Sequence, residues 1–80
     1  METRVAVMSI IVENVSSVET LNNILHEYRE YIIGRMGLPY KLKHINIISI
    51  ALDAPQDIIS ALSGRIGNLE GVNVKTAFSK

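Results

Sequence analysis

The segment Gly34-Arg35-Met36-Gly37-Leu38-Pro39-Tyr40 is the part of the chain whose residue types point most directly to binding. An arginine can hold a carboxylate or another anion through paired N–H donors, and flanking glycines let a ligand approach the backbone. The same residues could form a bulged edge strand whose methionine and tyrosine side chains pack in a subunit contact. Two polar residues near the first apolar run extend the candidate ligand site. Its residues are Asn14, Ser16, Arg35, Met36 and Gly37.

Two histidines are candidate metal ligands. His26 and Glu30 stand four residues apart, which places both on one helical face, where a local His–carboxylate pair is the simpler interpretation. His44 opens a predicted strand and is a weak candidate for a metal held across an oligomer interface. A pair of ligands does not make a metal site, and the chain has no cysteine. We therefore predict no metal and no other cofactor.

Glu13 and Asp53 follow two similar apolar runs and are the candidate catalytic carboxylates. Paired carboxylates can perform acid–base chemistry when they share a cleft. Both residues also precede predicted helices, where a negative charge interacts favourably with the helix dipole. No serine has a nucleophile-elbow pattern, and residues 13–17 do not form a glycine-rich phosphate loop. The sequence therefore predicts a protein that is not an enzyme.

Length and charge restrict the class of protein further. We expect one domain over residues 1–80, and a hydrophobic content of 48% is typical of a globular chain. Eight basic and eight acidic residues give a net charge of zero, which argues against direct binding to nucleic acid. The first apolar run is too short to span a membrane. We therefore expect a cytoplasmic protein that binds neither nucleic acid directly nor membranes.

The hydrophobic pattern predicts four strands and two helices. Ser16 and Glu19 have the spacing of a capping box, and the helix that follows should run to about residues 29–31. Pro55 suits the first turn of a second helix, which could end in a left-handed cap at Gly67-Asn68. The remaining predicted elements are strands over residues 4–12, 32–36, 45–52 and 72–78 and a loop over residues 38–43.

The two halves of the chain repeat the same pattern. Val18 corresponds to Ile58, and Ile32 to Val72, each forty positions apart. A β-α-β unit that occurs twice predicts an α+β ferredoxin-like sandwich, a four-stranded antiparallel sheet with two helices on one face. The first and third strands, which are apolar on both faces, should lie in the middle. Because two helices cover only one face, we expect a homo-oligomer, a dimer or tetramer, that buries the other.

Four segments resemble a family of small stand-alone proteins described as proposed regulators of the iron-only hydrogenase system. The resemblance extends over nearly the whole chain, and the Gly-Arg-Met-Gly-x-Pro-Tyr motif is its most specific part. The segments are Arg4-Val5-Ala6-Val7, Leu25-His26-Glu27-Tyr28, Ile33-Gly34-Arg35-Met36-Gly37-Leu38-Pro39-Tyr40 and Ala61-Leu62-Ser63-Gly64.

This family is similar to ACT-type βαββαβ domains and to the C-terminal domain of the nickel-responsive repressor. The resemblance implies the fold, a dimer or tetramer and a role in transcription regulation. That repressor domain binds nickel through a His-x-His pair and a later cysteine. His44 matches the first histidine, but Asn46 and Leu52 occupy the other two positions, so nickel binding is not implied. ACT domains often bind amino acids at a glycine-containing first strand–helix loop, and residues 13–17 contain no glycine.

The leading hypothesis is a non-catalytic regulatory module that oligomerises through its sheet and senses a small-molecule effector at a subunit junction. A separate partner would supply any DNA contacts. The alternative is a ligand-free oligomerisation or protein-interaction domain.

Overall fold

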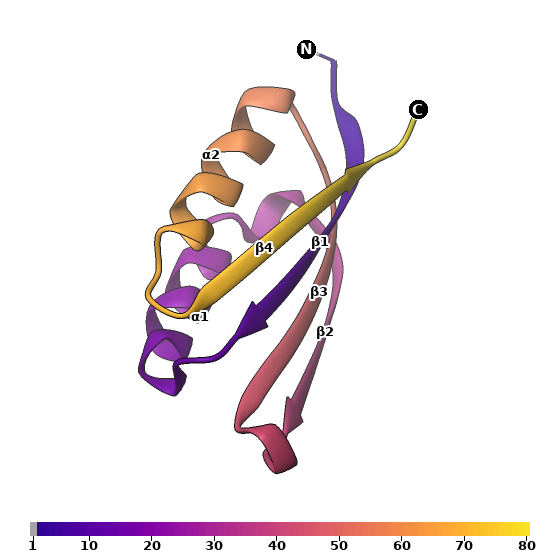
Figure 1. Cartoon of the computed structure of the whole chain (residues 1–80). Coiled ribbons are helices and arrows are strands. Elements are labelled where there is room, and N and C mark those ends of the chain that lie inside the picture. The colour runs from indigo at the N-terminus through magenta and orange to yellow at the C-terminus, as the bar shows by residue number, and fades with distance from the viewer. Residues whose placement is uncertain (1) are drawn as a thin grey trace.

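The two predicted β-α-β units form in the expected order (Figure 1). The computed structural model describes residues 2–80. Its strands and helices are β1 (Arg4–Val12), α1 (Val18–Glu27), β2 (Ile32–Tyr40), β3 (Ile45–Ala54), α2 (Gln56–Gly67) and β4 (Val72–Phe78). Three single turns of 3-10 helix, Val15–Ser17, Arg29–Tyr31 and Lys41–Lys43, join them.

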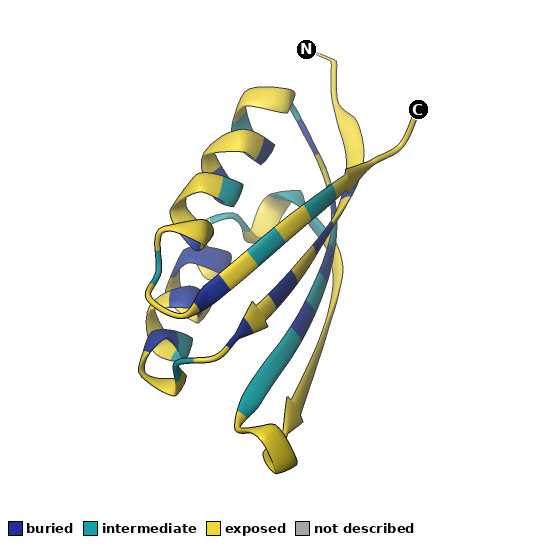
Figure 2. Ribbon diagram, in the orientation of Figure 1, coloured by how far each residue is buried: buried dark blue, intermediate teal, exposed yellow. Residues whose placement is uncertain are grey.

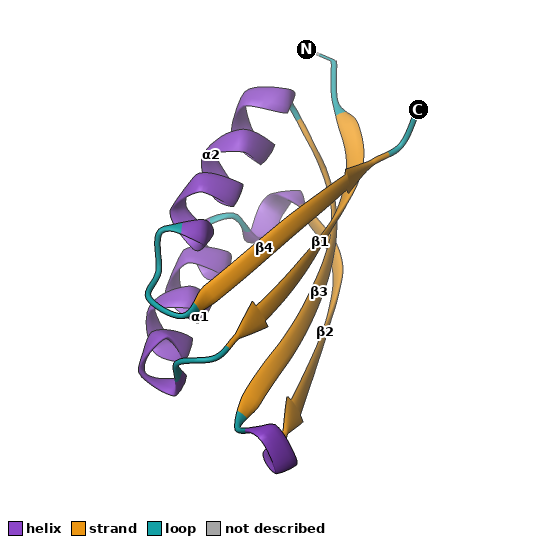
Figure 3. Ribbon diagram, viewed as in Figure 1, coloured by secondary structure: helices purple, strands orange, loops and turns teal. Residues whose placement is uncertain are grey.

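The four strands form one antiparallel sheet in the order β2-β3-β1-β4. Both helices lie on the same face of this sheet (Figure 3). The predicted α+β ferredoxin-like architecture, with the first and third strands in the centre, is therefore confirmed. The β2–β3 hairpin extends beyond the helix layer at the end of the sheet far from the chain termini (Figure 1).

The core lies between the sheet and the helices and is almost entirely aliphatic (Figure 2). Every second residue of β1 faces the helices and is buried, as the two-residue period of a strand requires. The fully buried large side chains are Met8, Ile10, Val12, Leu21, Leu25, Ile50, Leu52, Ile59, Leu62 and Ile66. Burying each such side chain contributes roughly 1.5–3 kcal/mol, so the shared core supplies most of the driving force for folding.

The start of α1 differs from the predicted capping box. A 3-10 turn precedes the helix, and the Asn14 side chain caps that turn by accepting from the Ser16 amide. Ser17 occupies the N-cap position of α1 without a capping bond. Its buried hydroxyl instead donates to the carbonyl of Glu70 at 2.7 Å. Ser17 therefore fastens this junction to the turn before β4 rather than capping the helix.

Several element boundaries also differ from the prediction. Helix α1 ends at Glu27, and the predicted extension to residues 29–31 is a separate 3-10 turn. Strand β2 continues to Tyr40, so the first part of the predicted loop is strand. Pro39 is tolerated there because β2 is an edge strand that needs no donor on its outer side. Strand β3 likewise extends to Ala54.

The left-handed residue near the end of the second half is Gly71 rather than Gly67-Asn68. Asn68 has φ −82°, so α2 ends without a left-handed cap, whereas Gly71 has φ +70°. A Cβ at Gly71 would lie 2.6 Å from Asn14 Cβ and 2.9 Å from the Asn14 amide nitrogen. The carbonyl of Gly71 accepts from the Glu13 amide at 2.7 Å. This position therefore needs glycine for both its conformation and its close approach to Asn14.

We expect Gly71→Ala to lower the free energy of unfolding by about 2 kcal/mol or more, because it combines a left-handed alanine with a backbone clash. Urea unfolding followed by circular dichroism measures the change. The matched control is Gly64→Ala in the middle of α2, where a Cβ meets nothing within 4 Å. That control should gain about 1 kcal/mol from helix propensity. A similar effect of both substitutions would contradict the assigned role of Gly71.

Candidate functional site

Two of the candidate ligand residues, Asn14 and Ser16, lie together after the end of β1. The Asn14 Oδ1 atom accepts from the Ser16 amide at 3.0 Å and from Ser16 Oγ at 2.7 Å. Both side chains are therefore engaged with each other in this structure. The side-chain NH2 group of Asn14 and the lone pairs of the Ser16 hydroxyl are the groups that a ligand could still meet.

The other candidates lie on β2 and point to opposite faces of the sheet. Arg35 is paired in register with buried Ile50, on the helix side, and Met36 is paired with Ser49 on the other side. Neither shares a pocket with Asn14 or Ser16. At Gly37 a Cβ would meet nothing within 4 Å, so no contact within residues 2–80 requires glycine there. The five candidate residues therefore do not converge on one cavity of a single chain.

Arg35 instead lines a pocket of about 270 Å³ between α1 and β2. Its Nη2 atom donates to Asn22 Oδ1 of α1 at 3.1 Å. The remaining lining residues are Leu25, His26, Arg29 and Ile32. Sequence reasoning did not select Asn22 or Arg29. Asn22, His26 and Arg29 stand at positions i, i+4 and i+7, which lie on one side of a predicted helix. This spacing is the sequence signal from which the two residues could be predicted.

His26 and Glu30 are not a helical pair in the structure, because α1 ends at Glu27 before Glu30 is reached. Glu30 borders a different depression, together with Glu27 and Arg29. Within residues 2–80 there is no group of three or more His, Asp or Glu side chains placed to share a metal ion.

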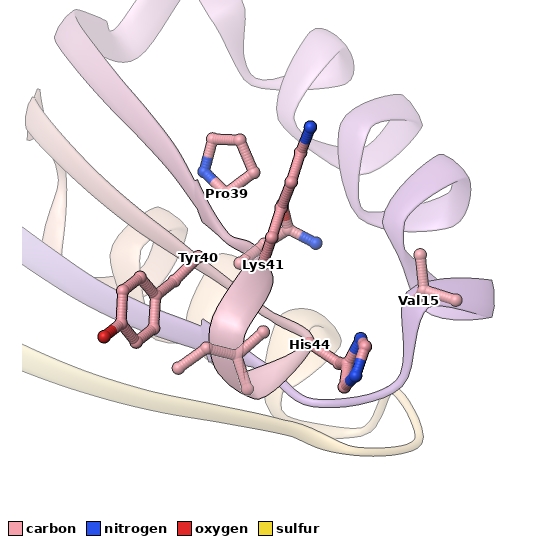
Figure 4. Close-up of a pocket in the computed structure, with 7 residues that line it drawn as sticks. Val15, Pro39, Tyr40, Lys41 and His44 are labelled. Atoms are coloured by element: carbon pink, nitrogen blue, oxygen red, sulfur yellow. The ribbon is translucent and has the colours of Figure 1, made fainter.

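A second pocket lies between the hairpin tip and the first strand–helix junction (Figure 4). It measures about 490 Å³ and is lined by Val15, Pro39, Tyr40, Lys41, His44, Ile45 and Asn46. His44 has a left-handed backbone (φ 55°) just before β3. Its imidazole lies on the side of the hairpin that faces Val15, whereas Tyr40 points away from it (Figure 4). This pocket combines apolar walls with one amide, one ammonium and one imidazole, a set suited to binding.

Glu13 and Asp53 lie at opposite ends of the sheet. Asp53 pairs with Val5 at the start of β1, and Glu13 follows Val12 at its other end. At about 3.3 Å per residue this register separates the two carboxylates by roughly 25 Å. Glu13 accepts from the Asn73 side chain at 3.4 Å instead. The two carboxylates therefore form no acid–base pair within the chain.

The sheet face opposite the helices, called here the open face, carries exposed apolar side chains from several strands. Three β1 side chains on it, Val5, Val7 and Ile11, are 41–43% exposed. The register places residues of β2 and β3 on the same face. Its apolar members are Val5, Val7, Ile11, Met36, Leu38, Tyr40, Ile47 and Ala51.

Among residues 2–80 neither helix has the length and hydrophobicity that crossing a membrane requires.

One ion pair joins the two helices. The Arg65 guanidinium of α2 donates to Glu27 Oε2 at the end of α1, and it also lies 5.7 Å from the centre of the Tyr28 ring. The hydrogen bond from Arg65, and then its charge, hold the pKa of the Glu27 carboxyl below its ordinary value. The same bond raises the pKa of Arg65.

The strand order and the single helix layer define the class: an α+β domain of the ferredoxin-like, ACT-type βαββαβ arrangement. A formyltetrahydrofolate deformylase from Pseudomonas putida KT2440 contains a similar fold, with a TM-score of 0.64 at 14% identity. The match covers 91% of this chain and 28% of the deformylase. At this identity the likeness shows the fold alone.

The chain belongs to the TM1266-like family, which is described as "Iron-only hydrogenase system regulator, putative" and whose model matches residues 4–76. The solved structure of the uncharacterized protein TM1266 from Thermotoga maritima is 35% identical, with a TM-score of 0.95. That match covers 99% of this chain and 100% of the other. No curated protein matches the chain. The predicted family membership is therefore confirmed.

The Arg65–Glu27 bond predicts a specific pH response. A carboxyl whose pKa is lowered by folding adds stability at neutral pH that is lost as the pH falls through its folded-state pKa. We expect Arg65→Gln to raise the Glu27 pKa toward its ordinary value and to reduce this acid-range dependence. Carbon-detected NMR titration of the Glu27 carboxyl measures the change. Arg4→Gln, which removes a guanidinium bonded to Gln56 and Ser79, should leave Glu27 unchanged.

Proposed function

We propose that this protein is a non-catalytic regulatory module of an iron-only hydrogenase system, and that it assembles as a homo-oligomer through the open face. The family description supports the regulatory role. The observation that carries the assembly is the uncovered apolar side of the central strands.

The composition of the open face favours a second copy of the same chain. Exposed apolar patches of this kind usually mark an interface in soluble proteins. At its centre Ser9 of β1 lies opposite Ser49 of β3. Small side chains there allow two sheets to approach closely, while the flanking valines and isoleucines fill the space between them. A two-fold axis through this region would bury the same patch on both subunits.

Glu13 and Asp53 lie at opposite ends of the sheet, so the two carboxylates cannot act as an acid–base pair. This separation favours regulation over catalysis. The balanced charge of eight basic and eight acidic residues favours a regulator whose DNA contacts come from a partner protein. The effector, in this proposal, is a small molecule that binds near a subunit junction. Asn14 and Ser16 stand beside Val15, which lines the hairpin pocket and is 73% exposed.

The second candidate function is a ligand-free oligomerisation or protein-interaction domain, and the same open face supports it. A thermal-shift screen separates the two functions. A ligand specific to the folded state adds about 2.7 kcal/mol of stability at one hundred times its Kd. A concentration-dependent rise in Tm with an amino acid, nucleotide or phosphorylated compound favours effector sensing. An unchanged Tm across the screen favours the interaction domain.

For assembly, the decisive substitution is Val7→Lys at the centre of the open face. Val7 pairs with Ala51 and Ala77, so a lysine there places a charge in the middle of the proposed interface. We expect the wild-type chain to form an even-numbered oligomer in native mass spectrometry and the variant to be a monomer. The control is Leu42→Lys at the hairpin tip, where the leucine is 82% exposed and lies off this face. A monomeric wild type, or equal dissociation in both variants, would refute assembly through the open face.

A further inference from the structure

We propose that the pocket between α1 and β2 binds a small phosphate monoester, with Arg35 and Arg29 holding the phosphate group. This site is separate from the hairpin pocket, near which the proposed function places its effector, so the inference goes beyond that function. The binding itself is a property of one chain and can be measured whatever the oligomeric state.

Arg35 reaches the pocket because the strand register turns it toward the helices. It is opposite Ile50, a buried core residue, so its side chain leaves the sheet on the side of α1. Its bond to Asn22 Oδ1 fixes the guanidinium across the gap between strand and helix. An asparagine amide that accepts through oxygen keeps two N–H donors. Asn22 therefore positions Arg35 and offers a donor of its own.

Arg29 approaches from the other side, from the 3-10 turn that follows α1. Its Nη1 atom donates to the backbone carbonyl of His26 at 2.9 Å. This carbonyl belongs to the last turn of the helix, where the dipole is negative. The guanidinium covers that negative end and leaves its remaining N–H groups for other acceptors.

Neither arginine of the pocket forms an ion pair within the described chain; Glu27 and Glu30 border a neighbouring depression with Arg29. Over residues 2–80, the one ion pair within 4.0 Å joins Arg65 to Glu27, so neither Arg29 nor Arg35 has a carboxylate partner there. Glu27, the carboxylate at the end of the same helix, is bonded to Arg65. None of the six residues lining the pocket is acidic. Two unpaired guanidinium groups that border one pocket point to an anion as the missing partner.

The donor set matches phosphate better than carboxylate. Three groups from different elements, Arg29, Arg35 and Asn22, border the pocket, and a phosphate monoester has three terminal oxygens to accept from them. A carboxylate has two. The remaining wall consists of Leu25, which is buried, Ile32, which packs against the core, and the imidazole of His26. A volume of about 270 Å³ leaves room for a short organic group beside the phosphate.

The test is a titration of the ¹⁵N-labelled full chain with butyl phosphate, inorganic phosphate and butyrate, at ionic strength held constant with sodium chloride. The Asn22 side-chain amide and the arginine Nε–H signals report binding at the pocket. We expect saturable shifts with butyl phosphate, weaker binding of inorganic phosphate and still weaker binding of butyrate. Native mass spectra of the same samples record the oligomeric state, so a failure of assembly is recognised separately.

Two single variants and one control locate the site. Arg35→Gln and Arg29→Gln should each weaken butyl phosphate binding by about tenfold, the usual effect of losing one charge-assisted hydrogen bond. Arg29 lies on an exposed turn, so its variant remains informative if Arg35→Gln does not fold. Lys43→Gln removes one positive charge at the hairpin tip and should bind like the wild type.

Three results would overturn the proposal. Shifts that do not saturate, or that spread over all basic residues, would mean that the anion meets only the general charge of the protein. Binding of butyl phosphate that is weakened as much in Lys43→Gln as in the two arginine variants would lead to the same conclusion. Butyrate that binds as tightly as butyl phosphate would rule out phosphate as the recognised group.

Discussion

Strand β1 is apolar on both faces, and the architecture of the protein follows from the need to bury them. Its even-numbered residues form the centre of the core, and its odd-numbered residues carry the open face. Only one layer of helices is available, because each β-α-β unit supplies one helix. The chain therefore buries half of its central apolar surface by folding and leaves the other half at 41–43% exposure for Val5, Val7 and Ile11. Intramolecular packing and proposed self-association are two uses of one strand.

The fold could be predicted from the sequence because its signals are periodic. The apolar runs over residues 4–12 and 45–52, the two predicted helices and the forty-residue repeat all point to the same topology, and agreement between levels is what makes a fold predictable. The wrong predictions concern positions where contacts between residues far apart in the sequence determine the local structure. Ser16 is predicted to cap α1 together with Glu19, but Ser17 takes the N-cap position, and its hydroxyl bonds to Glu70, fifty-three positions away, which no local pattern reveals.

The candidate site was only partly accessible to sequence reasoning. Arg35 was selected for its chemistry, but its neighbours Asn22 and Arg29 come from the helix and turn that precede β2, and their convergence depends on how α1 packs. Glu13 and Asp53 are equivalent in the repeat, yet antiparallel pairing of β1 with β3 places equivalent strand ends at opposite ends of the sheet. Internal similarity therefore predicts secondary structure well and spatial proximity poorly.

The pairing of β2 with β3 is irregular between positions 32 and 34 of β2, and this irregularity determines which side chains each face of β2 presents. Ile32 and Arg35 both pair with helix-facing residues of β3, Leu52 and Ile50, although three positions separate them. In the regular strand β4, the equivalent of Arg35 is Lys75, which pairs with Ser9 on the open face. One extra residue of β2 opposite β3 thus exchanges the two sides of the strand. It moves a cation out of the apolar surface and into the pocket, and it brings a methionine in its place. In the second half of the repeat, β4 has the same number of residues but pairs without this irregularity, so its cation stays on the open face at Lys75.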